Sequence, residues 1–140
     1  MKLTNKDTTM NQEIIAAIDV TYAATSEGKL HFGQVVAQLI QAGVEAYQID
    51  YRARRASYYL PNGDVHSIEM DAPASQLPEA FDADGLIKAI RAAQAGTVNY
   101  PEFKRLSQAA GCVGYMVWIS GRHVSYFGRR GETHVEKFPD

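Results

Sequence analysis

The fold is decided by the stretch AGVEAYQIDYRARRASYYLPNGDVHSIEM, residues 42–70, which returns 68 positions later as AGCVGYMVWISGRHVSYFGRRGETHVEKF, residues 110–138. Extended back to Gly28, the two copies align without a gap and share nine identities over the 41 pairs that end at Ile68. Ordinary residue frequencies would give roughly two or three identities by chance. A repeat of this length that occurs twice predicts a pseudo-two-fold domain rather than a solenoid.

Two helices are predicted at the start of each copy, because apolar residues recur there at helical spacing. Gly28 and Gly96 stand where a left-handed residue would end the first helix of each copy. Gly43 and Gly111 stand at the corresponding ends of the second helices. Asn99 is placed to cap the second helix of the later copy at its N-terminus.

Three strands complete each copy. In the first copy they are expected at residues 48–52, 56–60 and 65–70. Two-residue turns are predicted at Ala53-Arg54 and Asn62-Gly63, where the Asn-Gly pair favours a type I′ hairpin, and at Gly121-Arg122 and Arg130-Gly131 in the second copy. The predicted fold class is therefore α+β, an internally duplicated α-α-β-β-β unit whose antiparallel sheet carries its helices on one face.

Length and composition predict a single domain over residues 1–140. Repeat unit one is expected at about 12–70, a linker rich in Ala, Pro and Ser at about 71–80, and repeat unit two at about 81–138. A hydrophobic fraction of 46% and a charged fraction of 21% are ordinary globular values, which argues against disorder. The net charge of −2 argues against a strongly basic nucleic-acid binder.

Cysteine usage and the polar N-terminus predict a cytoplasmic protein. The single cysteine, Cys112, cannot form an internal disulfide and is interpreted as a small buried hydrophobe. Residues 1–12 lack the apolar centre of a signal peptide, and no apolar run approaches the roughly 20 residues of a membrane span. No membrane partner, metal or cofactor is expected.

Side-chain alternation along the strands separates two faces of the predicted sheet. With two-residue turns, one face is apolar and includes Tyr47, Ile49 and Tyr58, so it is expected to pack on the helices. The opposite face is predicted to carry the candidate ligand or interface residues His66, His134, Glu136, Tyr59, Asp50, Trp118, Phe127 and Met116. A one-residue bulge at either turn would reverse these faces.

The leading hypothesis is a non-enzymatic binding or protein-interaction module. Trp118, Met116 and Phe127 together would expose an apolar patch of the kind that marks an interface or a pocket. We therefore expect a homodimer or another protein partner, with a small ligand as a further candidate.

Two alternatives remain open. The equivalent histidines His66 and His134, with Glu136 or Asp50 as orienting carboxylates, suit a small-molecule or metal-dependent enzyme. One ancestral histidine, kept in both copies for packing or an aromatic contact, is the favoured explanation of the pair. Tyrosine-rich strands beside arginines at the predicted turns suit single-stranded nucleic acid. Half of those tyrosines fall on the predicted core face, which argues against nucleic-acid binding.

The second half of the chain resembles a known family. The runs GCVGY at residues 111–115 and GETHVE at residues 131–136, together with YYLPNG at residues 58–63, are similar to the YbcV-like proteins of bacteria and prophages. The resemblance covers about residues 14–139 and implies a bacterial, prophage-linked origin. Some members carry the label phage envelope protein, and the resemblance implies no catalytic or binding residues, because the family's function is uncharacterised.

Overall fold

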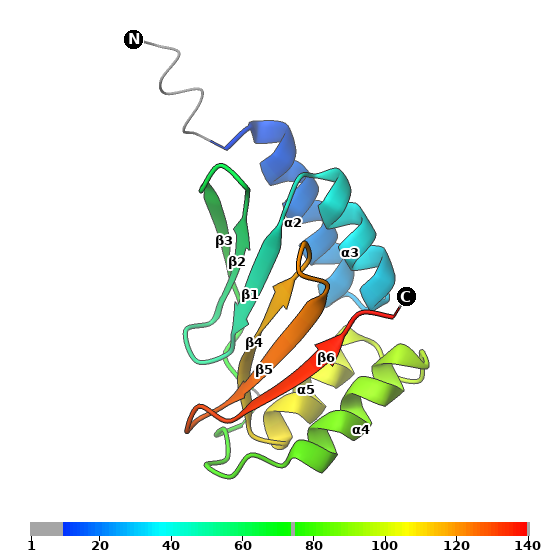
Figure 1. Cartoon of the computed structure of the whole chain (residues 1–140), viewed down its shortest axis with the longest axis vertical. Helices are drawn as coiled ribbons and strands as arrows, with labels where there is room; N and C mark the ends of the chain where they lie inside the picture. Colours follow the sequence, from blue (N-terminus) through cyan, green and yellow to red (C-terminus); the bar gives the residue numbers. More distant parts are fainter. Residues whose placement is uncertain (1–9, 74, 140) are drawn as a thin grey trace.

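The computed structural model describes residues 10–73 and 75–139, and two similar units follow one another in them (Figure 1). The first unit consists of α2 (Gln12–Ser26), α3 (Phe32–Gln41), β1 (Ala46–Asp50), β2 (Arg55–Tyr59) and β3 (Val65–Glu69). The second consists of α4 (Ala83–Gln94), α5 (Tyr100–Ala109), β4 (Cys112–Trp118), β5 (His123–Gly128) and β6 (Thr133–Lys137). The predicted α+β class and the repeated helix-helix-strand order are confirmed.

The strands of both units join into one antiparallel sheet with the order β3-β2-β1-β4-β5-β6. Its centre is the pairing of β1 with β4, in which Gln48 lies opposite Met116. These two residues are themselves 68 positions apart, so the pseudo-two-fold axis passes between them. The strands β3 and β6 are equivalent by the repeat and form the two opposite edges of the sheet.

The described helices all pack on one face of this sheet, as Figure 1 shows with the helices to the right of the strands. We call this the helix face, and the opposite one, which no described helix covers, the open face. Leu39 from α3, Leu86 from α4 and Val117 from β4 are fully buried between the two layers. Within the described residues, no helix is both long and apolar enough to cross a membrane.

The hairpins β1–β2 and β4–β5 have longer loops than the sequence predicts. Ile49 pairs with Ala56 rather than with Tyr58, because residues 51–54 form a four-residue turn that ends at Arg54 with φ of 56°. The equivalent residue Arg122 has φ of 58°, and Val117 pairs there with Val124. The register therefore shifts by two residues, which leaves every side chain on its predicted face.

In the hairpins β2–β3 and β5–β6 the loop is one residue longer than predicted. The side chains of β3 and β6 therefore lie on the opposite face of the sheet from the predicted one. A three-residue loop replaces the expected type I′ turn: the Gly63 N–H donates to the Leu60 carbonyl, and Gly63 has φ of 94°. Pro61 favours this loop because it presets the first position of a type I turn that a left-handed glycine completes. His66 consequently pairs with Tyr58 instead of Tyr59.

The second unit has the same three-residue loop. The Gly131 N–H donates to the Gly128 carbonyl, and His134 pairs with Tyr126 instead of Phe127. The prediction that His66, His134 and Glu136 lie on the open face is therefore wrong, since all three belong to the helix face.

Candidate functional site

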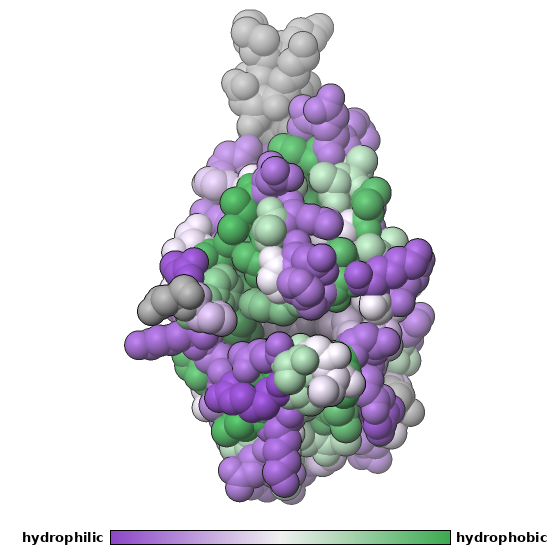
Figure 2. All heavy atoms as spheres, turned by 90° about the vertical axis from the view of Figure 1, so that its right-hand side faces the viewer, coloured by the Kyte–Doolittle hydropathy of each residue, from purple (hydrophilic) through white to green (hydrophobic). Residues whose placement is uncertain are grey.

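A cleft of about 900 Å³ opens on the helix face, between the pair α2–α3 and the pair α4–α5. Each pair packs against itself within its own unit, and α2 also touches α5. Figure 2 looks onto this side and shows the surface hollowed between two groups of side chains, with hydrophobic residues gathered beside the hollow. Two helix pairs on one continuous sheet thus leave a concave site between them.

Tyrosines form the floor of the cleft. Tyr47 on β1, Tyr58 on β2, Tyr115 on β4 and Tyr126 on β5 all face the helices and line it. Alternation along each strand puts them on this face, and the repeat relates Tyr47 to Tyr115 and Tyr58 to Tyr126. The Tyr47 and Tyr58 rings stack at 5.3 Å between centroids, and those of Tyr115 and Tyr126 are also 5.3 Å apart.

The walls come from the helix-helix turns of both units. His31 caps α3 through its Nδ1, which accepts from the Gln34 N–H at 3.3 Å, and the equivalent Asn99 caps α5 by accepting from the Glu102 N–H at 3.1 Å. Gly28 lies against Asn99 so closely that a Cβ there would stand 2.7 Å from the amide nitrogen. The two turns therefore meet over the centre of the sheet.

One side of the cleft is lined by the segment that follows β6. The Phe138 ring meets the Phe32 ring of α3 edge-on at 5.6 Å, which links the two units. The Arg122 guanidinium lies over the Phe138 ring at 5.6 Å and donates to the Pro139 carbonyl at 3.1 Å. Aromatic contacts and one cation–π contact therefore hold this wall in place.

The tyrosine hydroxyls of the floor are neutral. Burial raises the pKa of Tyr47, Tyr58 and Tyr126 well above the ordinary value of 10.0. Burial also raises the pKa of Tyr115. The hydroxyls of Tyr115 and Tyr100 interact, but the contact lies outside hydrogen-bonding geometry, and the Tyr100 oxygen has no hydrogen-bond partner among the described residues. Protonated hydroxyls donate or accept hydrogen bonds and do not act as bases at neutral pH.

The predicted histidine pair does not form one site. His66 on β3 and His134 on β6 lie at opposite edges of the sheet, with four strands between them. His66 Nε2 lies 2.8 Å from Asp19 Oδ1 of α2. His134 Nε2 lies 2.6 Å from Glu136 Oε2. His66 therefore links β3 to α2, whereas His134 contacts a carboxylate of its own strand. The hypothesis that the two histidines act together in one site is wrong.

Glu136 is the most heavily contacted of the predicted site residues. Two nitrogens of Arg91 on α4 donate to its carboxylate at 2.8 and 3.3 Å. These bonds, and then the contact with His134, hold the pKa of Glu136 below its ordinary value of 4.5 against the opposing effect of burial. Glu136 borders the cleft, but its charge is already paired.

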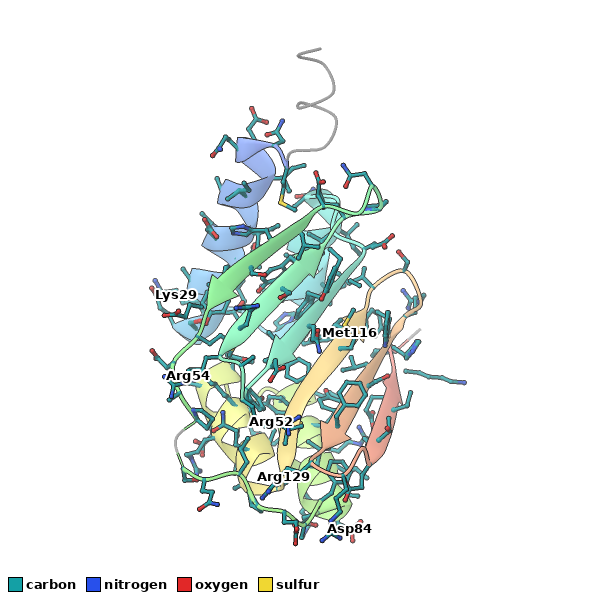
Figure 3. The ribbon with its side chains drawn as sticks, turned by 90° about the vertical axis from the view of Figure 1, so that its left-hand side faces the viewer. Lys29, Arg52, Arg54, Asp84, Met116 and Arg129 are labelled. Atoms are coloured by element: carbon teal, nitrogen blue, oxygen red, sulfur yellow. The ribbon has the colours of Figure 1, made fainter. Side chains whose placement is uncertain are left out.

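The remaining predicted residues lie on the open face. Met116 marks its middle in Figure 3, and Trp118, 40% exposed, donates its Nε1–H to Ser125 Oγ at 3.3 Å. Phe127 is half-buried, and the Tyr59 hydroxyl donates to Gln48 Oε1 at 3.4 Å. Their role as an interface stays a prediction.

Asp50 has a local structural role. Its Oδ1 accepts from the Arg52 and Ala53 N–H groups at 3.0 Å and so caps the turn after β1. Within residues 10–73 and 75–139, no three His, Cys, Asp or Glu side chains come together as a metal site. Cys112 is fully buried as predicted, and burial raises the pKa of its thiol to about 11.

Arginines lie at the hairpin turns, as the nucleic-acid alternative assumes. Arg52, Arg54 and Arg129 occupy the same part of the molecule in Figure 3. Arg129 donates to the Leu77 carbonyl at 3.3 Å, and Arg130 pairs with Glu79 at 2.9 Å. Binding of single strands by this surface stays a prediction.

Sequence reasoning missed the cleft, although it placed the floor tyrosines correctly on the helix face. The sequence feature that could have indicated the cleft is the recurrence of tyrosine at equivalent positions of the two copies, Tyr47 with Tyr115 and Tyr58 with Tyr126. Packing alone does not demand a hydroxyl at four related core positions, because a buried tyrosine needs a partner that phenylalanine does not.

The fold and cleft define an internally duplicated α+β protein with a tyrosine-floored site on the helix side of its sheet. A family model described as "Protein of unknown function (DUF1398)" matches residues 25–136, and the chain belongs to that family. It is similar to Uncharacterized protein Mb2035 of Mycobacterium bovis and to Uncharacterized protein Rv2012 of Mycobacterium tuberculosis. Each is 29% identical over 109 residues, which cover 76% of this chain. The matched region spans 66% of the length of these curated relatives.

Proposed function

We propose that the protein is a non-enzymatic module that reversibly binds a small, largely apolar molecule in the tyrosine-floored cleft. The observation that carries the proposal is the size of the cleft together with its lining. Its volume of about 900 Å³ falls within the roughly 300–1,000 Å³ of small-molecule sites. Buried aromatic and aliphatic side chains supply most of the surface, while Lys29, Arg122 and Lys137 are exposed at its border.

The chemistry of the floor favours binding over proton transfer. A general base must lose its proton near the working pH, and the raised pKa values of Tyr47, Tyr58 and Tyr126 keep these hydroxyls protonated. Glu136, the carboxylate at the border, is held by Arg91. The resemblance to YbcV-like proteins carries the further proposal of a cytoplasmic, prophage-derived accessory role, which rests on sequence motifs alone.

The test is a titration with Nile red, an uncharged dye whose fluorescence rises in apolar sites. We expect saturable binding with one dye per chain. Ala93 lines the cleft from α4, so Ala93→Phe should fill it and weaken binding by about tenfold or more. Ala23→Phe, on an exposed position of α2 that does not line the cleft, is the matched control and should leave the affinity unchanged.

Two further variants decide where the dye sits. Val98→Phe fills the cleft at a second position and keeps the test valid if Ala93→Phe fails to fold. Trp118→Ala removes the most exposed aromatic group of the open face. Loss of dye binding in Trp118→Ala, with Ala93→Phe and Val98→Phe unaffected, would overturn the proposal in favour of the open face as the binding surface.

A further inference from the structure

The cleft lies on the pseudo-two-fold axis, and its lining repeats accordingly. The axis passes between Gln48 and Met116 at the centre of the sheet. Residues 68 positions apart line the cleft as pairs, namely Tyr47 with Tyr115, Tyr58 with Tyr126 and Phe32 with Tyr100. A molecule bound across the axis would therefore meet similar groups at both of its ends.

Three hydroxyls that face the cleft have no hydrogen-bond partner among the described residues. The residues Tyr47, Tyr58 and Tyr126 are only 5%, 4% and 7% exposed, but their hydroxyl oxygens keep access to the cleft and make no hydrogen bond to any residue that the structure describes. Among the described tyrosines, Tyr100 has the fully buried hydroxyl without a hydrogen-bond partner. A hydroxyl that faces a cleft without a protein partner is available to water or to a polar group of a ligand. Tyr58 and Tyr126 are equivalent by the repeat, so each unit contributes one hydroxyl to this matched pair.

The electrostatics of the cleft disfavour an ionic ligand group at these hydroxyls. Burying a charge without a partner of opposite charge is costly, and the floor supplies only neutral groups. Of the charged groups that line the cleft, Lys29 pairs with Glu27 at 2.7 Å and Glu136 pairs with Arg91. Arg122 and Lys137 are exposed at the border, where Arg122 donates to the Pro139 carbonyl. A neutral hydroxyl or carbonyl on the ligand is therefore the matching partner.

The ring arrangement favours an aromatic body. The stacked pair Tyr47–Tyr58 and the tilted pair Tyr115–Tyr126 have the same centroid separation of 5.3 Å on the two sides of the axis. Aromatic rings attract one another beyond the area they bury, and a planar ring fits against such surfaces at little entropic cost.

We propose that the cleft takes an uncharged aromatic molecule with a neutral hydrogen-bonding group at each end, bound across the pseudo-two-fold axis. This inference rests on the proposed function and adds the chemical class of the ligand. The end groups pair with the hydroxyls of Tyr58 and Tyr126, one from each unit, and the rings lie along the floor tyrosines.

The test compares three rod-shaped compounds as competitors of Nile red. They are 4,4′-dihydroxybiphenyl, biphenyl without polar ends, and biphenyl-4,4′-dicarboxylate with charged ends. The diol should bind about tenfold more tightly than biphenyl, since two neutral hydrogen bonds are added. Tyr58→Phe and Tyr126→Phe should each weaken the diol by about 3- to 10-fold and leave biphenyl unchanged.

The substitutions suit the test because neither hydroxyl bonds to another of the described residues, so removing it breaks no hydrogen bond seen within the fold. Tyr59→Phe removes a hydroxyl on the open face and is the control that should change nothing. If the diol binds no more tightly than biphenyl, or if the dicarboxylate binds more tightly than both, the assignment of the ligand class is overturned. Binding of Nile red would in that case still support the cleft as a binding site. If Nile red itself does not bind, the proposed function fails and this inference fails with it.

Discussion

His134 and Glu136 illustrate how position on a strand sets the chemistry of single residues. They lie two residues apart on β6, so alternation puts both side chains on the helix face. There Arg91 reaches Glu136 from α4, and His134 stacks beside Tyr126 with ring centroids 6.3 Å apart. A strand edge that would otherwise be loosely held is thereby fastened to a helix through charged groups.

The pH dependence of stability follows from Glu136. Its folded pKa lies below 4.5, so ionised Glu136 stabilises the native state above that value, and the contribution is lost as pH falls through the folded pKa. Glu136→Gln should therefore unfold more easily than the parent at neutral pH. The difference should shrink as both are acidified from about pH 7 to about pH 2.

Urea unfolding measured across that range checks this prediction. Glu69→Gln is the matched control, because Glu69 is an exposed carboxylate on the opposite edge strand, with no ion-pair partner among the described residues. A stability gap between Glu136→Gln and the parent that stays constant down to the acid end would contradict the assignment.

At the scale of elements, loop length decides which face each edge strand presents. The three-residue loop before β3 puts Ile68 on the helix face and Val65 on the open face, where it is 50% exposed. A two-residue turn would have exchanged them. The same loop in the second unit places β6 in the same way.

A pair of alanine substitutions tests this arrangement. Ile68 packs against the core, so Ile68→Ala should lower the free energy of unfolding by about 1–2 kcal/mol. Val65→Ala should change it by about 0.5 kcal/mol or less, because Val65 contacts mainly solvent. Chemical denaturation of both variants gives the comparison, and equal losses or the reverse order would contradict the register.

The sequence was sufficient for the elements that follow simple periodicity. The gapless repeat predicted both helix pairs and all the strands, and alternation placed Tyr47 and Tyr58 correctly. The predicted face of β3 was wrong because Asn62-Gly63 suits two loop types, and Pro61 and packing against α2 favour the longer one. The predicted face of β6 was wrong because residues 129–131 form a loop of the same length. A change of one residue in loop length moves His66 and His134 to the other side of the sheet.

At the scale of the whole molecule, duplication explains both the sheet and the cleft. Equivalent strands β1 and β4 pair at the axis, which merges two three-stranded units into one sheet. Each unit brings its own helix pair, and the cleft is the space that the two pairs leave over the axis. The spacing of apolar residues in the sequence does not predict the cleft, because the width of the cleft depends on the distance between the two helix pairs on the shared sheet.

The eight tyrosines of the chain allow the central claim to be measured directly. Six of them line the cleft, namely Tyr22, Tyr47, Tyr58, Tyr100, Tyr115 and Tyr126. Tyr59 lies on the open face and serves as the internal control. Tyr51 does not line the cleft, but its ring meets that of Tyr115 edge-on at 6.2 Å. Labelling the tyrosine rings with carbon-13 gives each a separate NMR signal.

The deciding measurement is an NMR titration of this labelled protein with 4,4′-dihydroxybiphenyl. We predict saturable shifts in the signals of the cleft tyrosines, largest for Tyr58 and Tyr126, with Tyr59 unmoved. Shifts led by Tyr59, or no shift in any cleft tyrosine up to the solubility limit of the compound, would contradict the account of a ligand cleft on the pseudo-two-fold axis.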